Sequence, residues 1–180
     1  SLLVGARTTL SGTTSGTLDM SAATNFTADV GLFQIGGSTS TSQSGASNTA
    51  VGTATLAENN TITATTGIII AEMAPAVSNT PVTSLLTFGA GTNDVTTPYV
   101  LVGGSRSTGR ITITAGGTLN LANGAGKTDL TIGSNAVQGT NTTTSGEMDL
   151  TGGIFVATLG QVTIGNKSNS TNSGAGTGTG

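Results

Sequence analysis

The sequence lacks cysteine, histidine and tryptophan, and only 7% of its 180 residues are charged, against roughly 25% in an ordinary soluble domain. Without cysteine no disulfide can form. Without histidine or cysteine the chain has no Ser-His-Asp or Cys-His nucleophile and no zinc site of the usual ligands. Five Lys and Arg residues against eight Asp and Glu give a net charge of −3. We therefore expect no nucleic-acid partner, because the chain lacks the basic surface that binds a phosphate backbone.

Long apolar runs are missing as well. No run approaches the roughly 18 residues that a membrane-spanning helix needs, so we expect no membrane-spanning segment. No charged start followed by an apolar stretch marks a signal peptide. Because the chain begins with Ser1 and ends in a Gly-rich segment, we expect a processed chain or a piece of a longer one.

Gly, Thr, Ser and Asn together supply 98 of the 180 residues. They are poor helix formers, and no apolar stripe with a 3.6-residue period runs for three turns, so we expect almost no helix. The apolar residues instead gather in short Val, Ile and Leu runs bounded by Gly, Thr and Ser, which is typical of strands. The scarcity of charge also argues against a disordered chain. The composition thus predicts an all-β fold.

A repeat of about 32 residues runs through the chain. Its first element is an apolar-x-apolar trio followed by a small residue, and these small residues are Gly5, Gly36, Ala71, Gly103, Gly133 and Gly165. A second trio recurs in phase at 18–20, 54–56, 86–88, 119–121 and 148–150. A third, weaker element follows at Phe26, Ile62, Val95 and 154–156, and in the fourth repeat only Ala125 is available. Three short strands per repeat predict a single-stranded parallel β-helix, or β-solenoid, of about five coils.

Alternation within the strands predicts which side chains form the core. Successive side chains of a strand point to opposite faces, so Leu18 and Met20 point inward while Asp19 points out. Stacked coils then place like on like. The predicted core column contains Phe33, Ile68, Val100, Leu130 and Val162. Glycines that follow the first strand of each coil suit corners with positive φ, and uncapped ends of such a rod would associate readily. We expect one solenoid domain over residues 1–180.

Two segments carry a resemblance to a known protein family. Residues 117–124, which read Gly-Thr-Leu-Asn-Leu-Ala-Asn-Gly, and 146–153, which read Gly-Glu-Met-Asp-Leu-Thr-Gly-Gly, resemble the Gly-Thr-Leu-x-Leu strand repeats of autotransporter-like passenger domains and adhesins of bacterial surfaces. The resemblance implies a right-handed parallel β-helix, export to the cell surface, and a role in adhesion or in a sheath or fibre. The chain departs from the family in its longer coil.

Acidic residues provide the candidates for chemistry. Glu147 and Asp149 lie two apart, and so on the same outward face of one strand, with Asp19 and Asn120 at equivalent positions of other coils. Paired carboxylates suit glycoside hydrolysis or glycan binding, whereas the simpler reading makes them solvent-facing positions of a polar strand. The Gly-rich calcium-binding nonapeptide is missing. We therefore expect no catalytic residue, no metal site and no cofactor.

Outward positions of the first strand form a candidate association stripe. This stripe contains Leu3, Gln34, Ile69 and Leu101, with Leu85 as a further outward apolar residue. Exposed apolar stripes usually mark a contact surface, although the long polar segment of each coil could instead fold back over this one. We expect an extracellular structural protein that assembles with itself in a surface fibre, sheath or adhesin, and not an enzyme. The alternatives are a polysaccharide lyase or glycosidase, a glycan-binding protein, and a phage-type receptor-binding module on the same fold.

Overall fold

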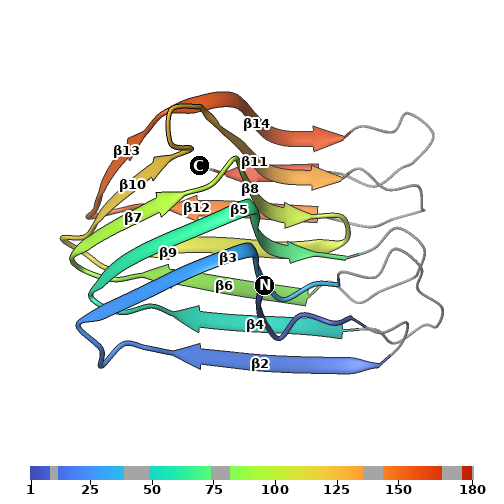
Figure 1. Ribbon diagram of the computed structural model, residues 1–180. Coiled ribbons are helices and arrows are strands. Elements are labelled where there is room, and N and C mark those ends of the chain that lie inside the picture. The colour runs from blue at the N-terminus through green and yellow to red at the C-terminus, as the bar shows by residue number, and fades with distance from the viewer. Residues whose placement is uncertain (9–11, 39–48, 74–81, 136–143, 168–175, 180) are drawn as a thin grey trace.

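The computed structural model describes residues 1–8, 12–38, 49–73, 82–135, 144–167 and 176–179, and within them all regular structure is β (Figure 1). The strands are β1 (Leu2–Val4), β2 (Thr13–Asp19), β3 (Asn25–Ile35), β4 (Thr49–Thr55), β5 (Asn59–Glu72), β6 (Val82–Phe88), β7 (Thr92–Thr96), β8 (Tyr99–Gly104), β9 (Ser107–Ile113), β10 (Thr118–Ala122), β11 (Thr128–Asn135), β12 (Thr144–Asp149), β13 (Ile154–Ala157), β14 (Leu159–Lys167) and β15 (Gly176–Thr179).

The strands form two parallel sheets that wind around one core. Sheet I has the order β15-β12-β9-β6-β4-β2, and sheet II has the order β13-β10-β7-β5-β8-β11-β14 with β1 and β3 added beside β5. Each coil passes through sheet I and then twice through sheet II, and the coils climb from blue to red in Figure 1. The predicted all-β parallel β-solenoid is confirmed.

Sheet II is bent into two arms. The first arm contains β7, β10, β13 and the N-terminal halves of β3 and β5, and the second arm contains β1, β8, β11, β14 and the C-terminal halves. A register shift between Val30 and Leu32 marks the bend in β3. The second arm matches the first predicted strand of each coil. Its register aligns the predicted column of Phe33, Ile68, Val100, Leu130 and Val162, and Leu2 of β1 extends it. Four of the five predicted residues are buried, but the prediction that Val162 is a core residue is wrong, because this side chain is 48% exposed at the last described strand of the arm.

The fourth coil differs from the prediction. Residues 119–121 were assigned to the second element, but they lie in β10 of sheet II, where Leu121 pairs with Val95. The sheet I position between Leu86 and Met148 is taken by Ile111 of β9. The cause is a short connection, since β8 ends at Gly104 and β9 begins at Ser107. The long polar segment of the other coils is absent there, so the strand arrives several residues earlier, and the prediction that Ala125 holds the third position is wrong.

Glycine closes the corner where sheet II turns back to sheet I. Gly5, Gly36, Gly103, Gly133 and Gly165 have φ between 62° and 71°, and Ala71, at the same position of its coil, has φ of 58°. These residues lie against an inward column of sheet I that contains Gly16, Gly52, Ser84, Gly109 and Gly146. A Cβ atom on Gly146 would lie 2.4 Å from the Gly133 nitrogen and 2.1 Å from the Val102 oxygen. The two sheets therefore touch backbone to backbone at this corner.

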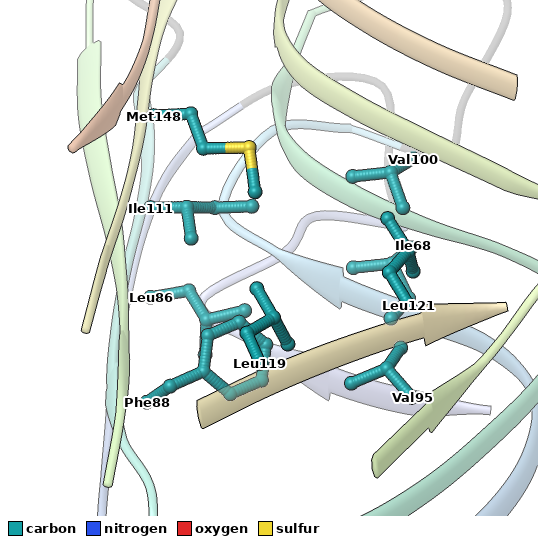
Figure 2. Close-up of a pocket in the computed structure, with 9 residues that line it drawn as sticks. All are labelled: Ile68, Leu86, Phe88, Val95, Val100, Ile111, Leu119, Leu121 and Met148. Carbon is teal, nitrogen blue, oxygen red and sulfur yellow. The ribbon is translucent and has the colours of Figure 1, made fainter. Parts of the chain in front are cut away.

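Apolar side chains fill the space between the sheets. Figure 2 shows Leu86, Ile111 and Met148 of sheet I facing Ile68 and Val100 of sheet II. A cavity of about 10 Å³ lies between them, and its walls are apolar. That volume is at the lower limit for one water molecule, and apolar cavities stay dry. The region around this cavity is thus packed with apolar side chains.

Candidate functional site

The structure brings Glu147 and Asp149 together with one basic residue. Both carboxylates project from the outer face of β12, and Arg110 of the neighbouring β9 reaches between them. Its Nε lies 3.2 Å from Glu147 Oε2, and an η-nitrogen lies 3.0 Å from Asp149 Oδ2. All three side chains are partly exposed. Such solvent-exposed pairs contribute about 0–1 kcal/mol to stability. The cluster therefore adds little to the stability of the fold.

The environment of Asp149 does not suit a general acid. Hydrogen bonds from Thr151, and then the Arg110 guanidinium, hold the pKa of this carboxyl below its usual value. An acid that protonates a glycosidic oxygen needs a raised pKa, which comes from burial or from a second unpaired carboxylate. Here each carboxylate has a guanidinium partner and faces solvent. The arrangement therefore favours the simpler reading, in which these residues are polar positions on the outer face.

Asp19 occupies the same outer column as Asp149 but lies far from it. The column runs through Asp19, Thr55, Thr87, Thr112 and Asp149. Four strand spacings separate the two carboxylates, which is roughly 19 Å. Hydrogen bonds from the Ser21 side chain and from its backbone nitrogen, which lies 3.0 Å from Asp19 Oδ1, hold the pKa of the Asp19 carboxyl below its usual value. Asn120 does not belong to the column, because it lies in sheet II and donates to Asp94 at 2.7 Å. Among the described residues no group of three or more acidic side chains could hold a metal ion.

The predicted association stripe has the expected register but not the expected exposure. Leu3, Gln34, Ile69 and Leu101 follow one another along the second arm. Leu3 is 38% exposed and Ile69 is partly exposed, whereas Gln34 and Leu101 are only 1% and 4% exposed. Leu85 lies in sheet I between Thr53 and Arg110, so it belongs to another face. Of these residues on the second arm, Leu3 and Ile69 are thus accessible in part, whereas Gln34 and Leu101 are covered.

The chain's own residues cover the buried part of the stripe. Gln34 Nε2 donates to the Gly36 oxygen at 3.1 Å, directly after the strand turns. Leu101 and Glu72 both pack against Gly104, where an added Cβ would lie 2.7 Å from Leu101 Cδ2 and 3.0 Å from Glu72 Cγ. Burial at this place raises the pKa of the Glu72 carboxyl. The predicted alternative, in which the long polar segment folds back over the stripe, falls on 39–48 and 74–81, which lie outside the described residues.

A different apolar surface is exposed at the C-terminal end of the solenoid. We call it the open end, and it contains Ile154, Phe155, Val156, Val162 and Ile164 of β13 and β14. These side chains are between 37% and 59% exposed. Phe155, Val162 and Ile164 continue the columns of Leu119, Leu130 and Ile132, and those three residues are at most 4% exposed. No strand in the described ranges pairs with the outer edges of β13 and β14, so core positions face solvent there.

Two buried asparagines were missed by the sequence reasoning. Asn60 and Asn93 lie on the inward side of the first arm, and Asn60 Nδ2 donates to Asn93 Oδ1 at 2.5 Å. Asn93 Nδ2 also lies within 3.2 Å of the carbonyl oxygens of Gly89, Gly91 and Thr118, and its Oδ1 accepts from the Gly89 nitrogen. The pair thus satisfies backbone groups at the turn from sheet I to sheet II. Their spacing of 33 residues, which matches the repeat, was the available signal.

Comparisons with known proteins add no identity. The chain matches no protein-family model, no curated protein and no solved structure. No helix in the described part of the chain is long and apolar enough to cross a membrane.

Proposed function

We propose that this chain is an extracellular structural protein whose solenoid units associate with one another in a surface fibre, sheath or adhesin. The open end carries this proposal. Parallel sheets that end in unpaired strands offer backbone donors and acceptors to another chain, and the large apolar side chains beside them favour contact with an apolar surface. Inside the solenoid the same two features hold each coil to the next.

The composition supports a location outside the cell or on its surface. Five Lys and Arg residues offer few sites to trypsin-like proteases, and a surface rich in Thr, Ser and Asn is hydrated without charge. The absence of cysteine removes any dependence on the redox state of the compartment. The resemblance of 117–124 and 146–153 to surface-protein repeats points the same way.

A polysaccharide-degrading enzyme on this fold has less support. The best carboxylate pair is bound to Arg110, and the pKa of Asp149 is lowered where a general acid needs the opposite. A glycan-binding protein would use the same outer faces. A phage-type receptor-binding module shares the fold and differs by assembling as a trimer.

Sedimentation velocity and electron microscopy of the purified chain test the proposal. We expect a series of multimers that grows with protein concentration, with elongated particles in the images. A monomer at every concentration would contradict the proposal, and a single stable trimer would favour the receptor-binding module. Incubation with neutral and acidic glycans, followed by mass spectrometry, should show no shortened products. Cleavage would favour the enzyme.

A further inference from the structure

We infer that Asn123 deamidates spontaneously in the folded protein and becomes a mixture of aspartate and isoaspartate. This inference stands apart from the proposed self-association. Asn123 is the only asparagine of the chain whose next residue is glycine. The reaction begins when the backbone nitrogen of the next residue attacks the side-chain amide carbon of the asparagine. Glycine hinders this attack least, because it has no Cβ atom.

Asn123 begins a tight turn between β10 and β11. The Gly126 nitrogen donates to the Asn123 oxygen at 2.6 Å, and Gly124 has φ of 51°. A Cβ atom added to Gly124 would have no neighbour within 4 Å. Residues 124–127 are exposed, and Asn123 itself is partly exposed. Solvent therefore has access to both groups that react.

The turn can open without breaking the pairing of the coils. On one side the Thr97 nitrogen donates to the Ala122 oxygen at 2.7 Å, and on the other the Thr128 nitrogen donates to the Thr158 oxygen at 3.0 Å. Between these two anchors the hydrogen bonds that the structure describes are internal to the turn. Short exposed segments of this kind open locally at little cost in free energy. Opening lets the backbone of Asn123 rotate into the conformation that the attack requires.

The bond changes of the reaction balance. The Gly124 nitrogen loses its proton to a solvent base and forms a bond to Asn123 Cγ. The bond between Cγ and Nδ2 then breaks, and Nδ2 takes up a proton and leaves as ammonia. One water molecule opens the resulting succinimide ring. Attack of the water at Cγ gives aspartate, and attack at the backbone carbonyl carbon gives isoaspartate, in which the main chain runs through the side chain.

Other asparagines in the described part of the chain are held in place. Asn60 and Asn93 are buried, and their amides are hydrogen-bonded. Asn120 lies only three residues before Asn123, but strands pair with its backbone on both sides, and its Nδ2 donates to Asp94 at 2.7 Å. A larger residue than glycine also follows each of these three. Asn120 is thus an internal control for the reaction at Asn123.

The modification changes the charge and the geometry of the turn. Both products gain one negative charge and lose the donor that lies 3.4 Å from the Lys127 oxygen. Isoaspartate also adds one atom to the backbone of the turn, which displaces Gly126 from the Asn123 oxygen. Because the bonds to neighbouring coils lie outside the turn, the solenoid stays folded. Chains of mixed charge therefore accumulate as the protein ages.

Peptide mapping with trypsin tests the inference, because cleavage after Arg110 and Lys127 releases Asn120 and Asn123 in one peptide. The native protein is incubated at mildly alkaline pH in water enriched in the heavy oxygen isotope. It is then unfolded and digested in ordinary water, so that only products of the incubation carry the label. Fragmentation by electron transfer assigns the label to a residue and separates isoaspartate from aspartate. We expect both products at Asn123 and none at Asn120.

Gly124→Ala is the matched variant. Ala71 shows that alanine adopts a similar φ, 58°, in this chain. The methyl group hinders the attacking nitrogen, so labelling at Asn123 should fall at least severalfold. The native chain in urea gives the rate without the turn, and we expect the folded protein to react at no less than about a tenth of that rate, because the turn opens locally. Circular dichroism checks the fold before and after incubation.

Three outcomes would overturn the inference. Label at Asn123 in urea but not in the folded protein would show that the turn stays closed. Equal label at Asn120 and Asn123 would show that the reaction does not select the turn. An unchanged rate in Gly124→Ala would show that the glycine nitrogen is not the attacking group.

Discussion

Replacing Gly146 by alanine perturbs the backbone contact that closes the solenoid. The added methyl group would lie 2.1 Å from the Val102 oxygen, 2.4 Å from the Gly133 nitrogen and 2.9 Å from Ile132 Cγ2. Carbon-to-oxygen contacts are rarely shorter than about 3.3 Å, so the sheets would have to separate by roughly 1 Å at this corner. Because two of the three neighbouring atoms belong to the backbone, no side-chain rotation can relieve the clash. Overpacking of a core costs about 1–3 kcal/mol. We therefore expect Gly146→Ala to lower the free energy of unfolding by about 3 kcal/mol.

Gly31→Ala is the matched control. A Cβ atom there has Thr66 Oγ1 as its nearest neighbour, at 3.8 Å, so we expect a change within about 0.5 kcal/mol. Urea unfolding of both variants, followed by far-ultraviolet circular dichroism, measures the free energy of unfolding from the midpoint and slope. If Gly146→Ala were as stable as Gly31→Ala, the close contact between the sheets would be refuted.

Two further substitutions test the polar interior and the covered stripe. Asn93→Ala should cost about 3 kcal/mol or more, because it leaves several buried backbone groups without partners, whereas Asn120→Ala on the outer face should be nearly neutral in the same urea assay. Equal effects would contradict the role of the buried asparagines. The raised pKa of Glu72 means that the folded state binds its proton more tightly, so stability from this carboxyl is present at acidic pH and falls as the pH rises above about 4.5. Glu72→Gln should therefore raise the melting temperature at pH 7 more than at pH 4, and a lower melting temperature at pH 7 would contradict this.

The sequence predicts the coil because stacking requires like residues at like positions. Phe33, Ile68 and Val100 recur at a nearly constant interval, and each is followed three positions later by Gly or Ala. A parallel solenoid is the arrangement that buries such a series. In the fourth coil the same pattern predicts the wrong strand for sheet I. Residues 111–113 and 119–121 both read apolar-polar-apolar, and only the two-residue connection before Ser107 decides which enters sheet I. Alternation within a strand carries no information about the length of a connection.

The alternation of side chains within a strand also does not predict which outward side chains are covered by residues outside that strand. Alternation places Gln34 and Leu101 outward, and the register agrees, but Gly36, Glu72 and Gly104 then pack against them. The same pattern predicts that Val162 is a core residue, but this side chain is 48% exposed. The role of the open end as a contact surface depends on which strands lie beyond it, and that is a property of the folded coil and of its neighbours.

Electron microscopy of the purified protein is the most direct test of the proposed self-association. The account predicts elongated assemblies that grow with protein concentration and contain strands about 4.8 Å apart along the solenoid axis. Single particles of monomer size at every concentration would contradict it.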